Sequence, residues 1–225
     1  MKKVYSGVLI AVEGTDGTGK STQVELLTRR LREMGLAVQK TREPTNGPYG
    51  QKIRELYSNR SRFTPEDELA LFTSDRRRHV AETIMPALLD GKIVITDRYY
   101  YSTAAYQGAR GLDPEEIIRM NETFAPRPDL VVLLFLPAHA SLHRIRTMRQ
   151  EEPNDFENAP SLDVVADIFA RLPGEIIKPI DASGSIDQVH ERIMDEVRKT
   201  LAALHRSLNG SWMRCEKPWQ PCTGR

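Results

Sequence analysis

The stretch "GTDGTGKS", residues Gly14–Ser21, decides the fold of this 225-residue chain. It fits the pattern G-x-x-x-x-G-K-[ST], in which glycines let backbone N–H groups converge on phosphate oxygens. The apolar run Val8–Val12 precedes it, and a helical pattern that carries Leu27 and Leu31 follows. A glycine-rich turn could arise by chance, but this strand–loop–helix context predicts a phosphate-binding loop (P-loop) at the start of an α/β domain.

Short apolar runs alternate with helical patterns along the rest of the chain. Runs without apolar–polar alternation are typical of strands that are covered on both faces. Helix starts separate them: Thr64 and Asp113 are N-cap candidates followed by proline, and Ser185 with Gln188 forms a capping box. The expected strands span residues 8–12, 37–41, 93–96, 130–136 and 176–180.

This order predicts an α/β protein with the P-loop NTPase fold, a doubly wound five-stranded parallel sheet flanked by helices. No linker divides the chain, so we expect a single domain over residues 1–206. The pattern then stops, and residues 207–225 are expected to form an irregular tail.

Composition excludes several classes of protein. The chain is 40% hydrophobic and 28% charged with a net charge of +1, so it lacks the field expected for non-specific nucleic-acid binding. Its longest apolar run, 130–136, is too short to cross a membrane. Cys215 and Cys222 could form a disulfide or half a metal site, but free thiols in a tail are favoured. We therefore expect a cytoplasmic protein without nucleic-acid or membrane partners.

A P-loop does not name a reaction, and two rival classes fit the remaining sequence less well. A regulatory GTPase should carry N-K-x-D, and no asparagine here precedes a lysine. The "DASG" stretch, Asp181–Gly184, matches the γ-phosphate sensor D-x-x-G but follows the last strand instead of a middle one. A mechanical ATPase would have the P-loop, but that function does not explain the charged strand ends and the aromatic–arginine pair described next.

Charged residues end two further strands. Arg42 in "TREP" ends the second expected strand, and Asp97 and Arg98 of "DRY" end the third. Ligands of open α/β sheets bind at the carboxyl edge of the strands, where these residues meet the P-loop. Three strand ends with phosphate-binding chemistry at one edge predict a second ligand beside the nucleotide.

The helical stretch "LFTSDRRRH" offers a place for a flat ligand. Phe72 and Arg76 are four residues apart and share a helix face, so a ring could stack on Phe72 while Arg76 donates to its edge. The alternative is a core phenylalanine beside a solvated arginine. We interpret the neighbouring Arg77, Arg78 and His79 as a charged, solvated face.

Further pieces follow one another over most of residues 7–196: "EGTDGTGKSTQ", "TREP", "GQKIREL", "LFTSDRRRHV", "PALLDGKIVITDRY", "STAAYQGARGL", "PDLVVLLFL" and "IDASGSIDQVHERI". In these pieces and their order the sequence resembles the thymidylate kinases, nucleoside-monophosphate kinases that make dTDP from dTMP and ATP. The resemblance implies a kinase with a lid at about residues 144–160, Mg²⁺ as cofactor, and a homodimer.

On the donor side, P-loop chemistry places Lys20 at the β- and γ-phosphates of ATP and the Ser21 hydroxyl on Mg²⁺. The resemblance adds Asp97 as a second group that organises Mg²⁺, partly through water, and the 181–185 loop beside adenine. The expected ATP-binding residues are Gly14, Thr15, Asp16, Gly17, Thr18, Gly19, Lys20, Ser21, Thr22, Arg144, Ala182 and Ser183.

On the acceptor side, the resemblance implies that Phe72 stacks on thymine, that Arg76 donates to its O4 atom and that Arg98 holds the 5′-phosphate. Tyr106 then lies under the deoxyribose, and Asp16 faces the acceptor. The expected dTMP-binding residues are Arg42, Tyr49, Phe72, Arg76, Arg98, Thr103, Tyr106 and Gln107.

Phosphoryl transfer needs alignment and charge neutralisation, so we expect direct in-line transfer without a phosphoenzyme. Some thymidylate kinases carry an arginine in the P-loop, whereas Asp16 is followed here by glycine and threonine. The lid must then supply a cation, from Arg144, Arg146 or Arg149, of which Arg149 is preferred. The expected catalytic residues are Lys20, Arg98, Asp97, Arg149 and Asp16.

Two stretches depart from the family pattern. Residues 154–157 read Asn-Asp-Phe-Glu where an Asp-Arg pair commonly precedes Phe-Glu, and residues 45–47 replace Gly-Gly-Thr by Thr-Asn-Gly. A kinase of another deoxynucleoside monophosphate, including a modified one, is therefore the alternative. A non-catalytic nucleotide-binding protein is the third hypothesis, and the intact Lys20, Ser21 and Asp97 argue against it.

Overall fold

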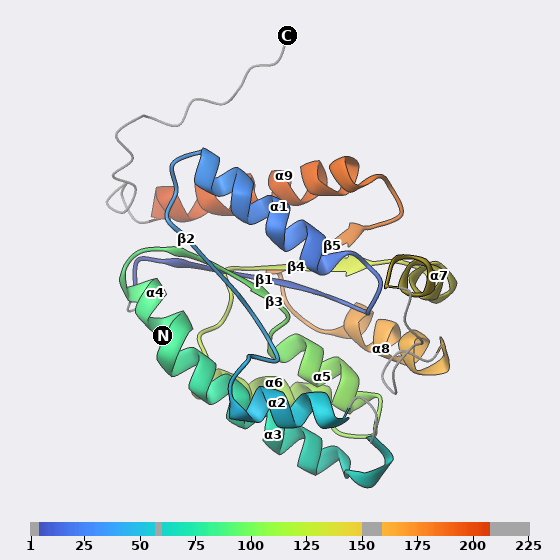
Figure 1. Cartoon of the computed structure of the whole chain (residues 1–225). Helices are drawn as coiled ribbons and strands as arrows, with labels where there is room; N and C mark the ends of the chain where they lie inside the picture. Colours follow the sequence, from blue (N-terminus) through green and yellow to red (C-terminus); the bar gives the residue numbers. More distant parts are fainter. Residues whose placement is uncertain (1–4, 57–59, 150–158, 208–225) are drawn as a thin grey trace.

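Five parallel strands form one sheet at the centre of the computed structural model, which describes residues 5–56, 60–149 and 159–207 (Figure 1). Their order is β2-β3-β1-β4-β5, which confirms the predicted doubly wound sheet. Each strand lies within two residues of its predicted range. The strands are β1 (Val8–Gly14), β2 (Val38–Arg42), β3 (Ile93–Asp97), β4 (Leu130–Phe135) and β5 (Ile177–Asp181).

Two helices, α1 (Lys20–Glu33) and α9 (Ile186–Ser207), cover one face of the sheet (Figure 1). Alternate side chains of β1, among them Ile10, point to this face and join Leu27 and Val197 in a buried cluster. Because α1 starts directly after the P-loop, this packing fixes the loop against the end of β1.

The opposite face carries a thicker helical layer (Figure 1). Leu9 and Ala11 of β1 point into it, and Tyr99, Tyr100 and Tyr101 are buried in the same core. Tyr100 and Tyr101, directly after the Asp-Arg-Tyr motif, thus serve packing. The layer consists of α2 (Pro48–Leu56), the 3₁₀ turn η1 (Arg60–Arg62), α3 (Pro65–His79), the π-helical stretch η2 (Val80–Ile84), α4 (Met85–Leu89), α5 (Tyr100–Gly108), α6 (Pro114–Glu122) and α8 (Ala159–Arg171).

The predicted helix caps are present. The Thr64 hydroxyl accepts a hydrogen bond from the Asp67 backbone N–H while the Asp67 carboxylate accepts from that of Thr64. Asp113 caps α6, and the side chains of Ser185 and Gln188 cap each other's backbone before α9. Local sequence therefore sets where α3, α6 and α9 begin.

The last connection runs through α7 (Ala138–Arg149), which leaves the end of β4 (Figure 1). Most of the predicted lid, from 150 to 158, and of the tail, from 208 to 225 with both cysteines, lies outside the described residues. Ser207, predicted to open the irregular tail, is still helical at the end of α9. No helix within the described ranges has both the length and the apolar character needed to cross a bilayer.

Candidate active site

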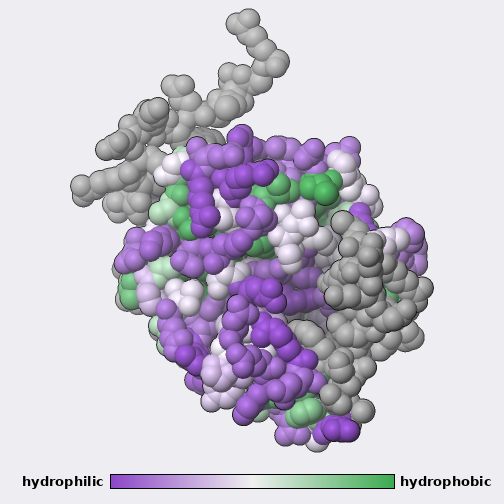
Figure 2. All heavy atoms as spheres, in the orientation of Figure 1, coloured by the Kyte–Doolittle hydropathy of each residue, from purple (hydrophilic) through white to green (hydrophobic). Residues whose placement is uncertain are grey.

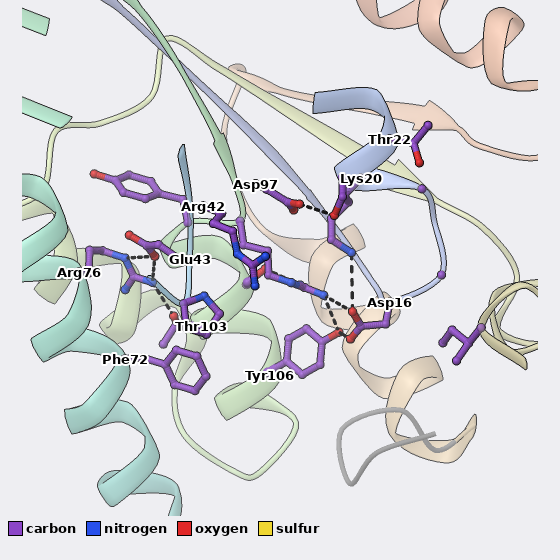
Figure 3. Close-up of a pocket in the computed structure, with 18 of the residues that line it drawn as sticks. Asp16, Lys20, Thr22, Arg42, Glu43, Phe72, Arg76, Asp97, Thr103 and Tyr106 are labelled. Atoms are coloured by element: carbon purple, nitrogen blue, oxygen red, sulfur yellow. Dashed lines mark hydrogen bonds and ion pairs between the residues drawn. The ribbon is translucent and has the colours of Figure 1, made fainter. Parts of the chain in front are cut away.

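A cleft of about 480 Å³ opens at the carboxyl ends of β1, β2 and β3, between the P-loop, α3 and α5 (Figure 3). Hydrophilic side chains surround the hollow in the middle of the molecule (Figure 2). Fifteen of the residues predicted from the sequence line this one cleft. They are Asp16, Gly17, Gly19, Lys20, Ser21, Thr22, Arg42, Phe72, Arg76, Asp97, Arg98, Thr103, Tyr106, Gln107 and Arg144.

The P-loop wraps around the ammonium group of Lys20. Lys20 Nζ donates to the Thr15 carbonyl at 2.7 Å, and the Thr18 hydroxyl donates to the same carbonyl at 2.9 Å. Gly17 has a left-handed φ of 82°, and a Cβ there would lie 2.4 Å from the Ser141 carbonyl oxygen. Burial, together with the charge of Arg98, lowers the pKa of Lys20 to about 8. A dense, buried positive charge thus faces the cleft at the start of α1.

Two oxygen donors meet beside the loop. The Ser21 hydroxyl donates to Asp97 Oδ2 at 2.5 Å, joining the first turn of α1 to the end of β3 (Figure 3). A hydroxyl and a carboxylate are the hard ligands that Mg²⁺ accepts, usually with phosphates and waters in its remaining positions. No group of three or more acidic, His or Cys side chains suited to a metal occurs in the described part of the chain. The donor set therefore fits a Mg²⁺ that arrives with a nucleotide.

An ion pair connects the P-loop to the helix that follows β3. Arg98 Nη2 donates to Asp16 Oδ1 at 2.7 Å, and the Tyr106 hydroxyl donates to Asp16 Oδ2 at 2.8 Å (Figure 3). The Arg98 guanidinium also lies 5.2 Å from the centre of the Tyr106 ring. Burial alone would lower the pKa of Arg98, but Asp16 and other nearby acidic groups outweigh it and raise that pKa.

The backbone at Arg98 is strained. Its φ is 69°, and within the described ranges no other non-glycine residue has a positive φ. The Thr96 hydroxyl donates to the Arg98 carbonyl at 2.7 Å and helps hold this conformation. The turn brings the guanidinium back to the P-loop, where Nη1 donates to the Gly14 carbonyl at 3.2 Å. Strain of this kind persists where a site needs it.

Glu13, a residue that the sequence analysis did not single out, caps the start of α5. Its carboxylate accepts from the backbone N–H of Tyr99 at 2.8 Å and from the Ser102 hydroxyl at 2.5 Å. Ser102 in turn accepts from Arg98 Nη1 at 2.8 Å. Burial raises the pKa of Glu13 to about 7. The signal for this role in the sequence was the position of Glu13, an acidic residue directly after the apolar run Val8–Val12.

Phe72 and Arg76 lie on one face of α3 and both line the cleft, but Arg76 is 1% exposed, so the alternative of a solvated arginine is wrong (Figure 3). Its Nε and Nη2 donate to Glu43 Oε2 at 2.9 and 2.7 Å. Nη2 also donates to Thr103, and Nη1 to Asn121. Because a guanidinium has five N–H donors, the described residues leave one N–H of Nη1 for a ligand.

Glu43 organises this end of the cleft and was also missed. Its Oε1 lies 3.0 Å from His79 Nδ1, and His79 Nε2 lies 2.6 Å from the Thr41 hydroxyl. The prediction that His79 belongs to a solvated face is therefore wrong, although Arg78 of the same stretch is exposed. Burial alone would raise the pKa of Glu43, but Arg76 and His79 outweigh it and hold that pKa below its ordinary value.

Other predicted residues lie at the margins. Arg42 is exposed at the rim of the cleft, and Arg144 Nη2 donates to the Ala182 carbonyl at 3.0 Å. Tyr49 is 39% exposed on α2 and does not line the cleft. The side chain of Arg149 falls outside the described residues. The predicted residues that do not line the cleft are Gly14, Thr15, Thr18, Tyr49, Ala182 and Ser183.

Comparison with known proteins agrees with this geometry. The thymidylate kinase family profile matches residues 12–193. The chain belongs to the thymidylate kinase family. The thymidylate kinase of Desulfotalea psychrophila is 53% identical over 195 residues, covering 87% of this chain and 96% of that protein. The thymidylate kinase of Xanthomonas campestris pv. campestris (strain B100) is 46% identical and covers 81% of this chain and 79% of its own length. That of Xylella fastidiosa (strain M12) is 40% identical and covers 88% of this chain and 92% of its own length.

We predict that Glu13 makes stability depend on pH. Its pKa is raised from 4.5 to about 7 in the folded state, so the folded protein holds this proton more tightly than the unfolded chain. The contribution of Glu13 to the free energy of unfolding is then fully present below pH 4.5 and is lost as the pH rises through about 7. Between pH 5 and pH 8, the wild-type value should fall by about 2–3 kcal/mol relative to Glu13→Gln in urea titrations. An equal difference between the two proteins at both pH values would show that Glu13 is not perturbed.

Proposed function

We propose that this chain phosphorylates dTMP to dTDP by direct transfer of the γ-phosphoryl group of ATP, for dTTP synthesis. One observation carries the proposal: a single cleft joins a P-loop to the partly buried Phe72 and the buried Arg76, and Arg98, paired with Asp16 of the loop, lines the same cleft. The P-loop suits a triphosphate, and Phe72 with Arg76 suits a flat base. Relatives that are 40–53% identical and bear the name thymidylate kinase support the same reaction.

The donor end holds ATP by its phosphates. The backbone N–H groups at the start of α1 and the Lys20 ammonium bind the β- and γ-phosphates. Ser21 and Asp97, already in contact, would hold Mg²⁺. When bound, Mg²⁺ neutralises charge on the phosphates. Arg144, next to the Ala182 carbonyl, places a further cation on the adenine side of the cleft.

The acceptor phosphate binds between the two ends. Arg98 is fixed by Asp16 and Ser102, which orient its guanidinium before any ligand arrives. Arg42 at the rim offers a second, exposed guanidinium. A cation held in place by other groups costs little reorganisation during transfer, which is why such groups stabilise charge in a transition state well. Arg98 is thus both the phosphate ligand and a catalytic residue.

The base end selects thymine. Phe72 stacks on the ring, and the remaining N–H of Arg76 donates to O4. Thr103, Tyr106 and Gln107 lie on the face of α5 that lines the cleft, so the deoxyribose rests on Tyr106. Exocyclic amino groups at the O4 position place a donor against a donor, which leaves buried polar groups unpaired.

Transfer is in-line and needs no phosphoenzyme. Lys20, Asp97, Asp16 and Arg98 align the two phosphates and offset their charge, and Arg149 supplies the lid cation. We further propose that the chain forms one kinase domain over residues 1–206 and works as a homodimer, in line with the family pattern. Its two cysteines, favoured as free thiols in the tail, suit the reducing cytoplasm.

The altered stretch Thr45-Asn46-Gly47 gives little support to a different acceptor. Thr45 is held by the Asp75 carboxylate through its backbone N–H and its hydroxyl, at 2.8 and 2.6 Å. Asn46 Oδ1 accepts from Arg54. These residues line a depression that adjoins the cleft at Ser21, Arg42 and Asp97, and they do not line the cleft itself, which holds Phe72 and Arg76. Their difference from Gly-Gly-Thr therefore leaves the base end unchanged.

A substrate panel tests the proposed reaction. ADP release from ATP and Mg²⁺ is measured with dTMP, dUMP, dCMP, dGMP, dAMP and UMP as acceptors. We expect dTMP to have the highest kcat/KM, with dUMP roughly 10–200-fold lower for the missing methyl group and dCMP lower by about 10⁴-fold. A preference for any other acceptor would contradict the assignment, and no turnover with any of them would favour a non-catalytic binding protein.

A single substitution tests the metal site. Asp97 lies in contact with Ser21, the other proposed Mg²⁺ ligand. The substitution Asp97→Asn keeps the shape of the side chain but removes the negative charge that attracts the ion. We expect the Mg²⁺ concentration for half-maximal rate to rise roughly 10–100-fold. Asp90→Asn, at an exposed position after α4, is the control and should leave it unchanged. The same Mg²⁺ dependence in Asp97→Asn as in wild type would exclude this carboxylate from the metal site.

A further inference from the structure

A second buried ionic cluster lies behind the base end of the cleft, and the reaction as described makes no use of it. Glu68 on α3 is 0% exposed. Arg60 of η1 donates to both of its carboxylate oxygens, at 2.9 and 3.2 Å. Arg110 donates to Oε1, and Gln107 Nε2 donates to Oε2 at 2.9 Å. The cluster therefore connects two arginines to a residue that lines the cleft.

The contact with Glu68 fixes which way the Gln107 amide points. A carboxylate between two guanidinium groups only accepts hydrogen bonds, so Gln107 has to present its NH₂ group to it. Gln107 Oε1 is buried and has no hydrogen-bond partner among the described residues. Nε2 already has a partner in Glu68, so the amide atom that lacks any partner is the acceptor Oε1. An unpaired buried acceptor is costly unless a ligand supplies a donor.

We propose that Glu68 is a positioning residue for base recognition: it locks Gln107 so that the cleft offers Oε1 to the N–H at ring position 3 of the base. This inference deepens the proposed function and rests on it. Arg76, which donates to Thr103 one helical turn before Gln107 and lines the same cleft, offers its remaining N–H as a donor. The pair then presents one donor and one acceptor to the edge of the base.

This pattern matches thymine and uracil and mismatches cytosine. Thymine and uracil carry an acceptor at O4 and a donor at N3–H, whereas cytosine carries an amino donor at position 4 and an acceptor at N3. If the Gln107 amide turned by 180°, its NH₂ group would face N3 and half of the discrimination would reverse. Glu68 prevents this turn because the turned amide would place its oxygen against the carboxylate.

The variant Glu68→Gln tests the lock. Two guanidinium groups, Arg60 Nε and Arg110, donate to Oε1, whereas Oε2 accepts from Arg60 only through Nη2 at 3.2 Å. The single oxygen of the new amide therefore takes the Oε1 position, and its NH₂ group faces Gln107. Gln107 then turns and presents Nε2 to the base. The bases of dUMP and dCMP both lack the methyl group of thymine, so the two substrates differ only at the edge that is tested. The ratio of kcat/KM for dUMP to kcat/KM for dCMP should fall roughly 10–100-fold. KM for ATP should not change, since the donor end is untouched.

Two matched variants separate positioning from folding. Glu68→Gln/Gln107→Glu exchanges the acid and the amide, keeps the net charge, and should restore the preference for dUMP over dCMP. Glu66→Gln, exposed on the same helix, should keep the wild-type ratio. An unchanged dUMP:dCMP ratio in Glu68→Gln, or an equal loss for both substrates that the double variant fails to reverse, would overturn the inference.

If Glu68→Gln does not fold, the wild-type protein carries the test. The side-chain NH₂ signals of Gln107, assigned by their loss in Gln107→Met, should exchange slowly with water in the ligand-free enzyme, because Glu68 holds them. Fast exchange would overturn the inference. A wild type that does not phosphorylate dTMP would instead refute the proposed function, whereas one that does, combined with an unchanged ratio in Glu68→Gln, refutes only the role of Glu68.

Discussion

The ion pair between Asp16 and Arg98 is the contact on which the rest of the site depends. It joins the P-loop, between β1 and α1, to the strained turn after β3, two segments more than eighty residues apart in sequence. Tyr106 donates to the same carboxylate and thereby fixes α5 relative to the loop. The proposed donor and acceptor subsites thus share one rigid support, as phosphoryl transfer requires when alignment provides most of the catalysis.

Behind this contact, buried acids hold the parts of the cleft that meet the acceptor. Glu13 caps α5, Glu43 holds Arg76, and Glu68 holds Gln107. Burying a carboxylate is costly unless it is paired and hydrogen-bonded, and each of these three accepts several hydrogen bonds. They place the groups that face a ligand before it binds, which lowers the entropy lost on binding.

The sequence was sufficient for the fold because that information is local. Strand composition, the P-loop and the caps at Thr64 and Asp113 act within a few residues, and all were found where expected. Most of the residues that line the cleft were also predictable, since motifs at strand ends meet at one edge of the sheet. The buried acids were not, because Glu43 pairs across 33 residues and Glu68 across 39, and isolated glutamates usually belong to a solvated surface.

His79 was also predicted wrongly because its contacts come from residues distant in sequence. In a run of charged residues it was expected in solvent, but the last residue of α3 lies beside the end of β2, between Glu43 and Thr41. Glu68 did carry a signal in hindsight, because it lies four residues before Phe72 and eight before Arg76 on the same helix face. A polar stripe on a helix that packs against a sheet indicates a buried network instead of a wet surface.

The measurement that tests the central claim most directly is the single-turnover rate of phosphoryl transfer from saturating ATP and Mg²⁺ to dTMP in Arg98→Ala, with the exposed-site variant Arg29→Ala as control. If Arg98 positions the acceptor phosphate and stabilises its charge, the rate should fall roughly 10²–10³-fold or more while ATP still binds. A wild-type rate in Arg98→Ala would contradict the central role of the Asp16–Arg98 pair.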